Sequence, residues 1–342
     1  MLRLFGILAT VLFAVAAAVL TWPSFFRLER TYPVAQIVSF RGLVVAGFLG
    51  VIVLALLLAL PRTTRGFAFS IVLVAAIAVA ANAGIMMSRG LGADTLPAST
   101  DTSVRVMTWN TAGEATPSEA VAKTAVAMDA DIIALPETAE SVGESVAVAM
   151  REMGRPMWVH HVRFNTEIEN GPQAWETTIL ISPELGDYSV IESSRDGSSN
   201  TGVVPSAVAM PVDGDGPIVV AVHAVAPRSA YMPSWRDDLQ WLADQCAAAN
   251  VIMAGDFNAT LDHMSGLGVG NATLGQCRDA AAETGNGAVG TWTSQIPALA
   301  GAPIDHVMYS SHWKPTGSVV LRSMDDSGSD HRPLVVQLEP VG

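Results

Sequence analysis

Polar side chains follow five short apolar runs in the C-terminal part of the sequence, at the point where each run ends, and a sixth polar motif opens the last run. In chain order the motifs are TWN at 108–110, PE at 136–137, the histidine after VVAV at 219–222, GDFN at 255–258, IDH at 304–306 and SDH at 329–331. Polar groups at the ends of buried strands meet at one edge of a sheet, so we expect a single site. Its predicted members are Asn110, Glu137, His223, Asp256, Asn258, Asp305, Asp330 and His331.

These eight residues comprise four carboxylates, two amides and two imidazoles, and this mixture indicates the chemistry. Carboxylate oxygens without sulfur ligands favour Mg²⁺ or Mn²⁺ over Zn²⁺. A histidine supported by a carboxylate is the usual group for deprotonating water near neutral pH. The set therefore predicts a divalent metal ion and a proton-transfer group that act together.

Taken one at a time, most of these motifs have an ordinary structural explanation. Glu137 after a proline is typical of a helix N-terminus, and Asp-His pairs are common in loops. GDFN is more specific, because Gly255 allows close backbone approach and Asp256 and Asn258 face the same side of an extended segment. The prediction depends on all six motifs occurring together and in this order.

In this order the motifs resemble those of the endonuclease/exonuclease/phosphatase superfamily, over about residues 104–338. GDFN and SDHRP at 329–333 are the most specific elements of the resemblance. It implies a four-layer α/β sandwich, in which two packed mixed sheets are flanked by helices. One departure is Pro136, which stands where many relatives have Gln. Since the family's metal ligand is the following Glu, this departure has little effect on the expected function.

The resemblance also implies a metal site and its surroundings. Asn110 and Glu137 match the positions that bind the divalent metal, Glu137 directly, and Asp330 matches the acid beside the metal and the reacting phosphate. We further expect His263, in the LDH motif after GDFNAT, and Trp292, in the GTW motif, to line the substrate site. Core packing is the alternative role for Trp292.

The remaining site residues match the family's proton-transfer and phosphate-binding positions. His331 matches the catalytic histidine, and Asp305 matches the carboxylate that orients and charges its ring. Asp256 and Asn258 match the pair that positions the attacking water and binds the phosphate, and His223 matches a second histidine of the nuclease and sphingomyelinase branches. The implied reaction is in-line attack of water on phosphorus. Asp256 and His331 are both candidates for the acid and for the base.

The elements that must position these residues follow from the hydropathy pattern of residues 104–342, the predicted catalytic domain. Several predicted strands follow one another without an intervening helix, which favours two packed sheets over a simple alternating βαβ fold. Strands are predicted over 104–109, 131–135, 177–181, 218–222, 251–254, 304–309 and 334–338, and helices over 118–128, 139–153 and 235–249. Residues 90–103, small and polar, are the predicted linker.

The first 89 residues form a separate, basic and apolar region. They carry seven Arg and one Glu, whereas residues 90–342 carry 12 basic and 31 acidic residues, giving net charges of +6 and −19. The apolar runs at 4–21, 42–60 and 66–87 contain no ionised side chain and are long enough to cross a bilayer. We therefore expect a multi-pass membrane protein; a cleaved signal peptide is the weaker alternative for the first run.

The orientation of these spans has only indirect support. With the N-terminus inside the cell, three arginines of this region lie on the cytoplasmic side and four lie outside. The positive-inside rule therefore does not decide the orientation. A short basic N-terminus on the inside, followed by three spans, would put the catalytic domain outside the cytoplasm. Cys246 and Cys277 are expected to be neighbours and could form a disulfide in an oxidising compartment; two buried free thiols are the alternative.

The leading functional prediction is a membrane-anchored, Mg²⁺- or Mn²⁺-dependent phosphoesterase acting on a phospholipid or another small phosphoester. The charge of −19 and the lack of a Lys/Arg cluster beside any motif argue against a stable nucleic-acid partner, with Arg228 and Arg332 the nearest single candidates. A DNA or RNA nuclease of the same superfamily is the alternative. A catalytically silent module that binds a phosphorylated ligand is less favoured, because no catalytic residue is missing.

Overall fold

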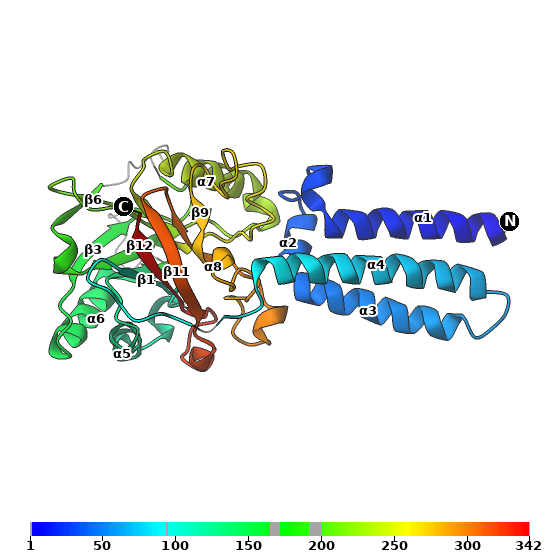
Figure 1. Ribbon diagram of the computed structural model, residues 1–342, viewed down its shortest axis with the longest axis horizontal. Coiled ribbons are helices and arrows are strands. Elements are labelled where there is room, and N and C mark those ends of the chain that lie inside the picture. Colours follow the sequence, from blue (N-terminus) through cyan, green and yellow to red (C-terminus); the bar gives the residue numbers. More distant parts are fainter. Residues whose placement is uncertain (1, 94, 165–171, 192–199, 342) are drawn as a thin grey trace.

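The computed structural model describes residues 2–93, 95–164, 172–191 and 200–341. Its two parts lie end to end along the long axis (Figure 1). Three long helices occupy one end, with the N-terminus at their far tip, and an α/β body occupies the other end. The change in composition after Arg89 therefore marks a change in architecture.

The three long helices are α1 (Leu2–Thr21), α3 (Arg41–Leu58) and α4 (Arg65–Arg89), within two residues of the predicted runs. All three are long and apolar enough to cross a membrane, with mean hydropathies of 2.5, 2.5 and 2.3. Helix α1 stops just before Trp22-Pro23 and α3 stops just before Pro61, because proline disfavours helical conformation in the residue that precedes it. The one-turn helices η1 (Pro23–Phe26) and α2 (Val34–Val38) lie in the segment that connects α1 to α3.

These helices bury only a narrow seam against one another. The buried side chains of the seam are small or aromatic, namely Ala17, Val44, Phe48, Ala75 and Ala78. Large apolar side chains elsewhere on the helices stay exposed, such as Phe5 at 73% and Leu54 at 63%. Hydrocarbon surroundings would cover such surfaces, as expected of membrane spans.

The α/β body contains two six-stranded mixed sheets. The first has the order β11-β12-β1-β2-β4-β3 and the second β5-β6-β7-β8-β10-β9. In chain order the strands are β1 (Val104–Thr108), β2 (Ile132–Pro136), β3 (Trp158–Arg163), β4 (Glu176–Ile181), β5 (Tyr188–Ile191), β6 (Ala207–Pro211), β7 (Ile218–His223), β8 (Val251–Asp256), β9 (Arg278–Asp279), β10 (Asp305–Tyr309), β11 (Trp313–Val320) and β12 (Leu334–Pro340). The pairs β1–β2 and β7–β8 are parallel, and the other pairs are antiparallel.

Three apolar layers hold the body together. The central layer joins the facing sides of the two sheets, for example Val106 and Ile179 with Val219 and Val307. The first sheet packs its other face against α5 (Ser118–Ala127) and α6 (Glu140–Glu152), and the second packs against α7 (Met232–Gln245). A single turn, α8 (Ala280–Glu283), precedes β10. The four-layer sandwich predicted from the sequence is confirmed.

The predicted strands agree with the structure within two residues at each end, but the predicted helix over 235–249 is displaced. It begins earlier, at Met232, where Pro233 occupies the first turn, a position that favours a proline. It ends at Gln245, because the chain must turn through the alanines at 247–249 to enter β8. Helix propensity alone could not show this turn.

The linker lies along the body instead of hanging free. Gly92 N donates to Gly285 O (3.0 Å), and Ala288 N donates to Gly90 O (3.1 Å). Gly90 has φ +90°, and a Cβ there would lie 2.1 Å from the backbone of Gly285, so glycine is required for this close approach. Thr95 forms a bridge with Ser318 of β11. The last helix is therefore fixed to the α/β body at its very end.

Cys246, just after α7, and Cys277, just before β9, form a disulfide with Cα atoms 5.5 Å apart. The sequence predicted that the two cysteines are neighbours and left open whether they are bonded; the structure has the bond in place of two free thiols. The bond joins residues 31 apart in sequence and ties the end of α7 to the segment that follows the GDFN loop.

Candidate active site

Three adjacent strands of the second sheet carry site residues at the same edge: β7 ends at His223, β8 ends at Asp256, and β10, which is antiparallel to β8, begins at Asp305. In the parallel pair β7–β8, His223 lies opposite Asp256, and in the antiparallel pair β8–β10, Asp305 lies opposite Asp256. Directly opposed residues project to the same face of a sheet, so these three side chains are neighbours. Gly255 is required just before Asp256, because it has φ +154° and a Cβ there would lie 2.0 Å from Val222 O on β7.

The first sheet supplies the other side of the site. Asn110 follows β1, Glu137 follows β2 directly, and His331 lies shortly before β12. Asn110 Nδ2 donates to Glu137 Oε1 (3.1 Å) and to Asp256 Oδ2 (3.2 Å), which links the two sheets. The six strand-end motifs therefore meet at one edge of the sandwich, as the sequence predicted.

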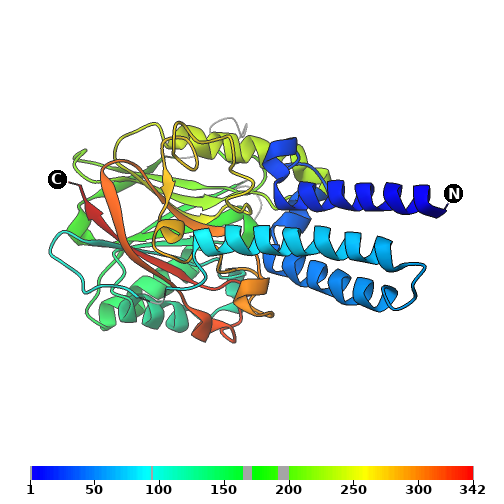
Figure 2. The ribbon, with the colours of Figure 1, turned by 45° about the vertical axis from the view of Figure 1, so that its right-hand side comes forward.

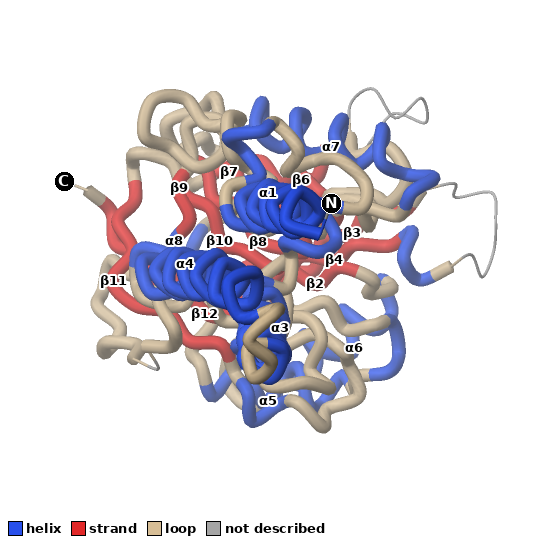
Figure 3. Tube along the Cα trace, turned by 90° about the vertical axis from the view of Figure 1, so that its right-hand side faces the viewer, coloured by secondary structure: helices blue, strands red, loops and turns tan. Residues whose placement is uncertain are grey.

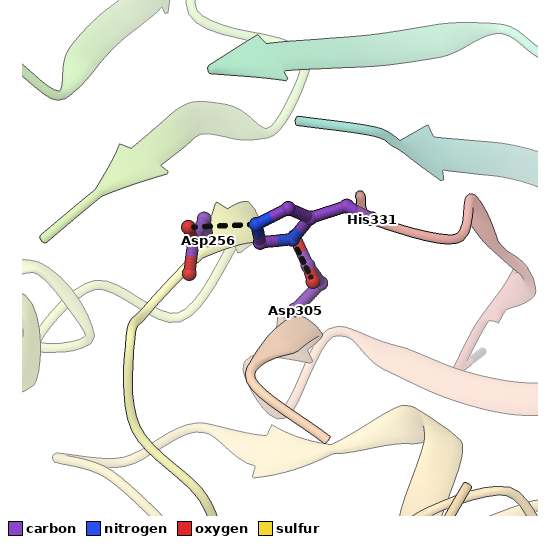
Figure 4. A group of neighbouring side chains, drawn as sticks. All are labelled: Asp256, Asp305 and His331. Carbon is purple, nitrogen blue, oxygen red and sulfur yellow. Dashed lines mark hydrogen bonds and ion pairs between the residues drawn. The ribbon is translucent and has the colours of Figure 1, made fainter. Parts of the chain in front are cut away.

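A buried chain of three ionisable groups forms the centre of the site (Figure 4). His331 Nδ1 is 2.8 Å from Asp305 Oδ2, and His331 Nε2 is 3.8 Å from Asp256 Oδ2. Burial by itself would lower the pKa of His331, but the adjacent Asp305 carboxylate and then Asp256 outweigh burial and raise the pKa to about 10. Burial and the nearby charge of Asp305 raise the pKa of Asp256 to about 6. The geometry therefore favours an imidazolium at His331.

The backbone around His331 is held by two groups whose role the sequence analysis did not assign. Ser329 Oγ donates to Asn110 O (2.6 Å) and accepts from His331 N (2.9 Å). Trp109 Nε1 donates to His331 O (2.9 Å). Ser329 belongs to the SDH motif and Trp109 to the TWN motif. Their position in sequence beside predicted site residues was the only sign in the sequence that they contribute to the site.

Glu137 is more accessible than Asp256 and Asp305, with 30% of its side chain exposed. Burial raises its pKa, but His223 Nε2, 3.6 Å away, and the amide of Asn110 outweigh burial and lower the pKa to about 2. Glu137 has φ 55° and Asn258 has φ 47°, a left-handed conformation that is uncommon outside glycine. Strained residues of this kind cluster at functional sites.

Asn258 is fixed by its backbone and side chain together. Its N–H donates to Asp256 Oδ1 (2.8 Å), and its Nδ2 donates to Ala224 O (2.9 Å) and Asp256 Oδ2 (3.2 Å). Trp235 Nε1 of α7 donates to Asn258 O (3.1 Å). The loop after β8 therefore presents Asn258 and Asp256 together, as the GDFN spacing suggested.

The donor chemistry of the site fits a hard divalent cation. Glu137 is ionised at neutral pH, and the amide nitrogen of Asn110 lies between the Glu137 and Asp256 carboxylates, where a positive partner would be stabilised. Asn110 Oδ1, the atom that would ligate a metal, instead accepts from Ala112 N (3.0 Å), so ligation requires the amide to rotate. Asp256, Asp305 and His331 also have oxygen and nitrogen atoms within 4.8 Å of one another, a spacing that suits one metal ion when His331 is neutral.

Asp330 and the two expected lining residues have different environments. Trp292 Nε1 donates to Asp330 Oδ2 (2.8 Å), so Trp292 lies beside the site and holds one of its acids. His263 is completely buried, and its two ring nitrogens bond to Thr260 N and Ala35 O. The expected lining role of His263 is therefore corrected, because it packs one layer behind Asn258.

Two further predicted neighbours have structural roles. Arg332 is 1% exposed and bonds to Asp325 and to four backbone carbonyl groups, those of Gly290, Thr293, Ser294 and Ile296. It therefore shapes the loop that carries Trp292 and is not free to bind a phosphate. His306 is buried between Asp279 Oδ2 (2.7 Å) and Ala259 O (2.8 Å), so it packs inside the body.

Two packed mixed sheets with a carboxylate–histidine site at one edge define an α/β-sandwich hydrolase. The sequence profile of the Endonuclease/Exonuclease/phosphatase family matches residues 107–331, and the chain belongs to this family. Members of this family are metal-dependent hydrolases of phosphoric esters, so the chain is an enzyme of that class. No curated protein sequence matched the chain.

Solved structures support the same fold. An endonuclease/exonuclease/phosphatase from Beutenbergia cavernae is 18% identical with a TM-score of 0.53, and the match covers 70% of this chain and 72% of that one. A family protein from Leptotrichia buccalis is 14% identical with a TM-score of 0.52, covering 69% and 99%. Humanized D. rerio TDP2 is also 14% identical with a TM-score of 0.52, and the match covers 69% of this chain and 99% of that one. At these identities the likeness concerns the fold.

Proposed function

We propose that the protein is a membrane-anchored, Mg²⁺-dependent phosphoesterase whose substrate is a phospholipid or another small phosphoester at the membrane surface. One observation carries this proposal: the catalytic edge of the sandwich faces the three apolar helices. Figure 3, seen along those helices, has α1, α3 and α4 in front of the strand ends. Gln36, between α1 and α3, donates to Pro227 O in the loop after His223, so the two parts touch beside the site.

The residues divide the reaction between them. Glu137, Asn110 and Asp330 would hold Mg²⁺ or Mn²⁺, which supplies a Lewis acid for the phosphate oxygens when bound. Asp256 and Asn258 orient a water molecule whose oxygen bonds to phosphorus as the bond to the leaving oxygen breaks.

The charge states support a division of the proton transfers. Asp256 takes the proton of the attacking water, because an imidazolium at His331 cannot accept one. His331 Nε2 donates to the phosphate or to the leaving oxygen, and Asp305 keeps the ring charged and oriented through the bond at Nδ1.

The charge distribution supports a small substrate over long nucleic acid. Nucleic-acid affinity depends largely on Lys and Arg that neutralise phosphates. Residues 90–342 carry a net charge of −19, and Arg332, close to the site in sequence, is buried among backbone carbonyls. A lipid phosphoester would instead be brought to the site by the bilayer in which the helices lie.

The disulfide supports an extracytoplasmic catalytic domain. Bonds such as Cys246–Cys277 persist in oxidising compartments and are rare in the cytosol. Helix α1 begins at the tip of the bundle farthest from the body (Figure 2), so three spans would separate the N-terminus from the catalytic domain. We therefore propose a cytoplasmic N-terminus.

The test uses the full-length chain in lipid nanodiscs with Mg²⁺. Hydrolysis of nanodisc phospholipids, inositol phosphates, plasmid DNA and bis(p-nitrophenyl) phosphate is measured in parallel, with His331→Ala as the matched control. We expect turnover of a lipid or small phosphoester, its loss with EDTA and its recovery with Mg²⁺ or Mn²⁺. Efficient plasmid nicking at physiological salt without turnover of lipid or inositol phosphate would favour the nuclease alternative. Binding of these phosphates without any hydrolysis would favour the silent module.

A further inference from the structure

A single carboxylate of the α/β body joins the ends of the helices. Asp262, four residues after Asn258, accepts two hydrogen bonds from Arg41 (both 2.7 Å), at the start of α3. It accepts two more from Arg89 (2.8 and 2.7 Å), at the end of α4. Arg41 also donates to Thr21 O (3.2 Å), at the end of α1.

This junction is buried, and its two arginines share one carboxylate. Asp262 is 7% exposed and Arg41 is 6% exposed. Asn82 of α4 accepts a hydrogen bond from Arg41 and donates to Thr21 Oγ1 (3.0 Å). The domain-side ends of all three helices are therefore fixed to one residue of the loop that follows β8.

The same loop connects the segment between α1 and α3 to Asn258. His263 Nδ1 accepts from Thr260 N (2.8 Å), so Nε2 carries the hydrogen and donates to Ala35 O of α2 (3.0 Å). The His263 ring packs edge-on against Trp235, with centroids 5.1 Å apart, and Trp235 holds the carbonyl of Asn258. A displacement of α2 would therefore also shift Asn258, because the packed rings of His263 and Trp235 connect the two.

A second connection reaches the opposite side of the site. Phe40, just before α3, packs on Trp292 with ring centroids 5.7 Å apart, and Trp292 Nε1 holds Asp330. The next turn also packs closely, because a Cβ on Gly42 would lie 1.9 Å from Leu299 O. No side chain larger than glycine's hydrogen fits there without a shift.

We propose that the segment 30–41 is a structural part of the active site. Phe40 of this segment is a positioning residue for Asp330, and Asp262, in the loop to which Arg41 of this segment bonds, is a positioning residue for Asn258. Neither residue touches the reacting atoms in this assignment. The helices then do more than anchor the enzyme, because their docked ends set the geometry of the catalytic loops. The activity readout of this inference rests on the proposed phosphoesterase function.

The experiment compares Asp262→Asn and Phe40→Ala in the full-length chain in nanodiscs, with bis(p-nitrophenyl) phosphate as a water-soluble substrate. A soluble substrate separates site geometry from delivery of a lipid. We expect kcat to fall on the order of 10- to 100-fold in each variant, because small displacements of positioned groups have large effects on rate. Phe40→Tyr keeps the ring contact and is expected to retain wild-type kcat.

Two control variants disturb comparable contacts away from the site. Asp131→Asn breaks a hydrogen-bonded ion pair with Arg155 (2.9 Å) just before β2, at the end of that strand opposite Glu137. Phe48→Ala removes a buried ring that packs on Phe13 within the helix bundle. Both controls are expected to change kcat less than twofold.

Hydrogen–deuterium exchange supplies a readout independent of activity. Exchange in residues 257–265 is expected to rise in Asp262→Asn, and exchange in 291–295 is expected to rise in Phe40→Ala, while both controls leave these loops unchanged. Wild-type exchange in these loops, or a kcat loss no larger than in the controls, would overturn the inference. If the wild-type protein hydrolyses no phosphoester, the proposed function fails, and the exchange data still decide the inference.

Discussion

Asp256, Asp305 and His331 lie together in a buried site. Burial and the charges of the neighbouring groups both shift the pKa values of Asp256 and His331. Asp305 lies opposite Asp256 in the β8–β10 ladder, and two neighbouring carboxylates in a buried site repel each other. The His331 ring stabilises both, which explains why its pKa is raised to about 10 although the ring is buried. The residues of the site therefore depend on one another for their charge states.

Removal of either the metal ligand Glu137 or the proton-transfer group His331 should abolish most of the activity. Glu137→Gln removes the charge of an assigned metal ligand, and His331→Ala removes the proton-transfer group. We expect each to lower kcat/KM by about 10²–10⁴-fold, a typical loss for a general acid or base. Steady-state kinetics at fixed Mg²⁺ measures this, and undiminished hydrolysis by His331→Ala would show that the assigned mechanism is wrong.

His263 predicts a pH dependence of stability. Complete burial lowers its pKa to about 4, whereas an unfolded chain takes up the proton near 6.5. The unfolded state then binds more protons between these values, so stability falls as the pH drops from about 6.5 to about 4, by up to roughly 3 kcal/mol. Chemical denaturation at several pH values measures it. His263→Gln should flatten this dependence, and an equally steep dependence in the variant would exclude His263 as its source.

At the scale of elements, the sequence predicted most of the framework. His223 and Asp256 could be found because each apolar run stops at a polar residue that can take part in catalysis. Asp305 instead opens β10, and its place at the same edge follows from the antiparallel pairing of β10 with β8. Strands β3, β5, β9 and β11 lie at the edges of the two sheets and were not predicted, because edge strands have weak apolar patterns. The interior strand β6 was missed although its residues are apolar. The junction at Asp262 was also missed, since nothing in the letters LDH shows that two arginines over 170 residues away in sequence converge on it.

The disulfide is the element-scale contact with the clearest energetic consequence. Cys246 and Cys277 are 31 residues apart, and a closed loop of this length stabilises a fold by about 3–4 kcal/mol through the entropy of the unfolded chain. Cys246→Ser with Cys277→Ser should therefore lower the free energy of unfolding by about that amount. Denaturant titration with and without reductant measures it. The double variant should be insensitive to reductant, and a wild-type protein equally insensitive to reductant would contradict the prediction.

At the scale of the whole molecule, the two parts of the chain share one interface at the catalytic edge. Arg30 donates to His263 O (2.6 Å) and Ser265 O (2.8 Å), and Arg41 and Arg89 bond to Asp262, so arginines of the basic region meet the loop after GDFN. Large aromatic side chains remain exposed beside this interface, with Trp22 at 48% and Phe25 at 82%. Aromatic and basic residues are enriched at membrane–water boundaries, which supports the proposal that the catalytic edge lies close to the lipid headgroups.

This arrangement predicts the membrane topology. With three spans, the N-terminus and the catalytic body lie on opposite sides, and the Cys246–Cys277 bond favours an oxidising side for the body. Intact cells that express the full chain are treated with protease, and fragments are followed by tags at the two termini. We expect the C-terminal tag to be lost and the N-terminal tag to be protected until the cells are permeabilised. A C-terminal body protected in intact cells would reverse the proposed orientation. The disulfide would then have to survive in a reducing compartment, and its alkylation state after unfolding without reductant would show whether it does.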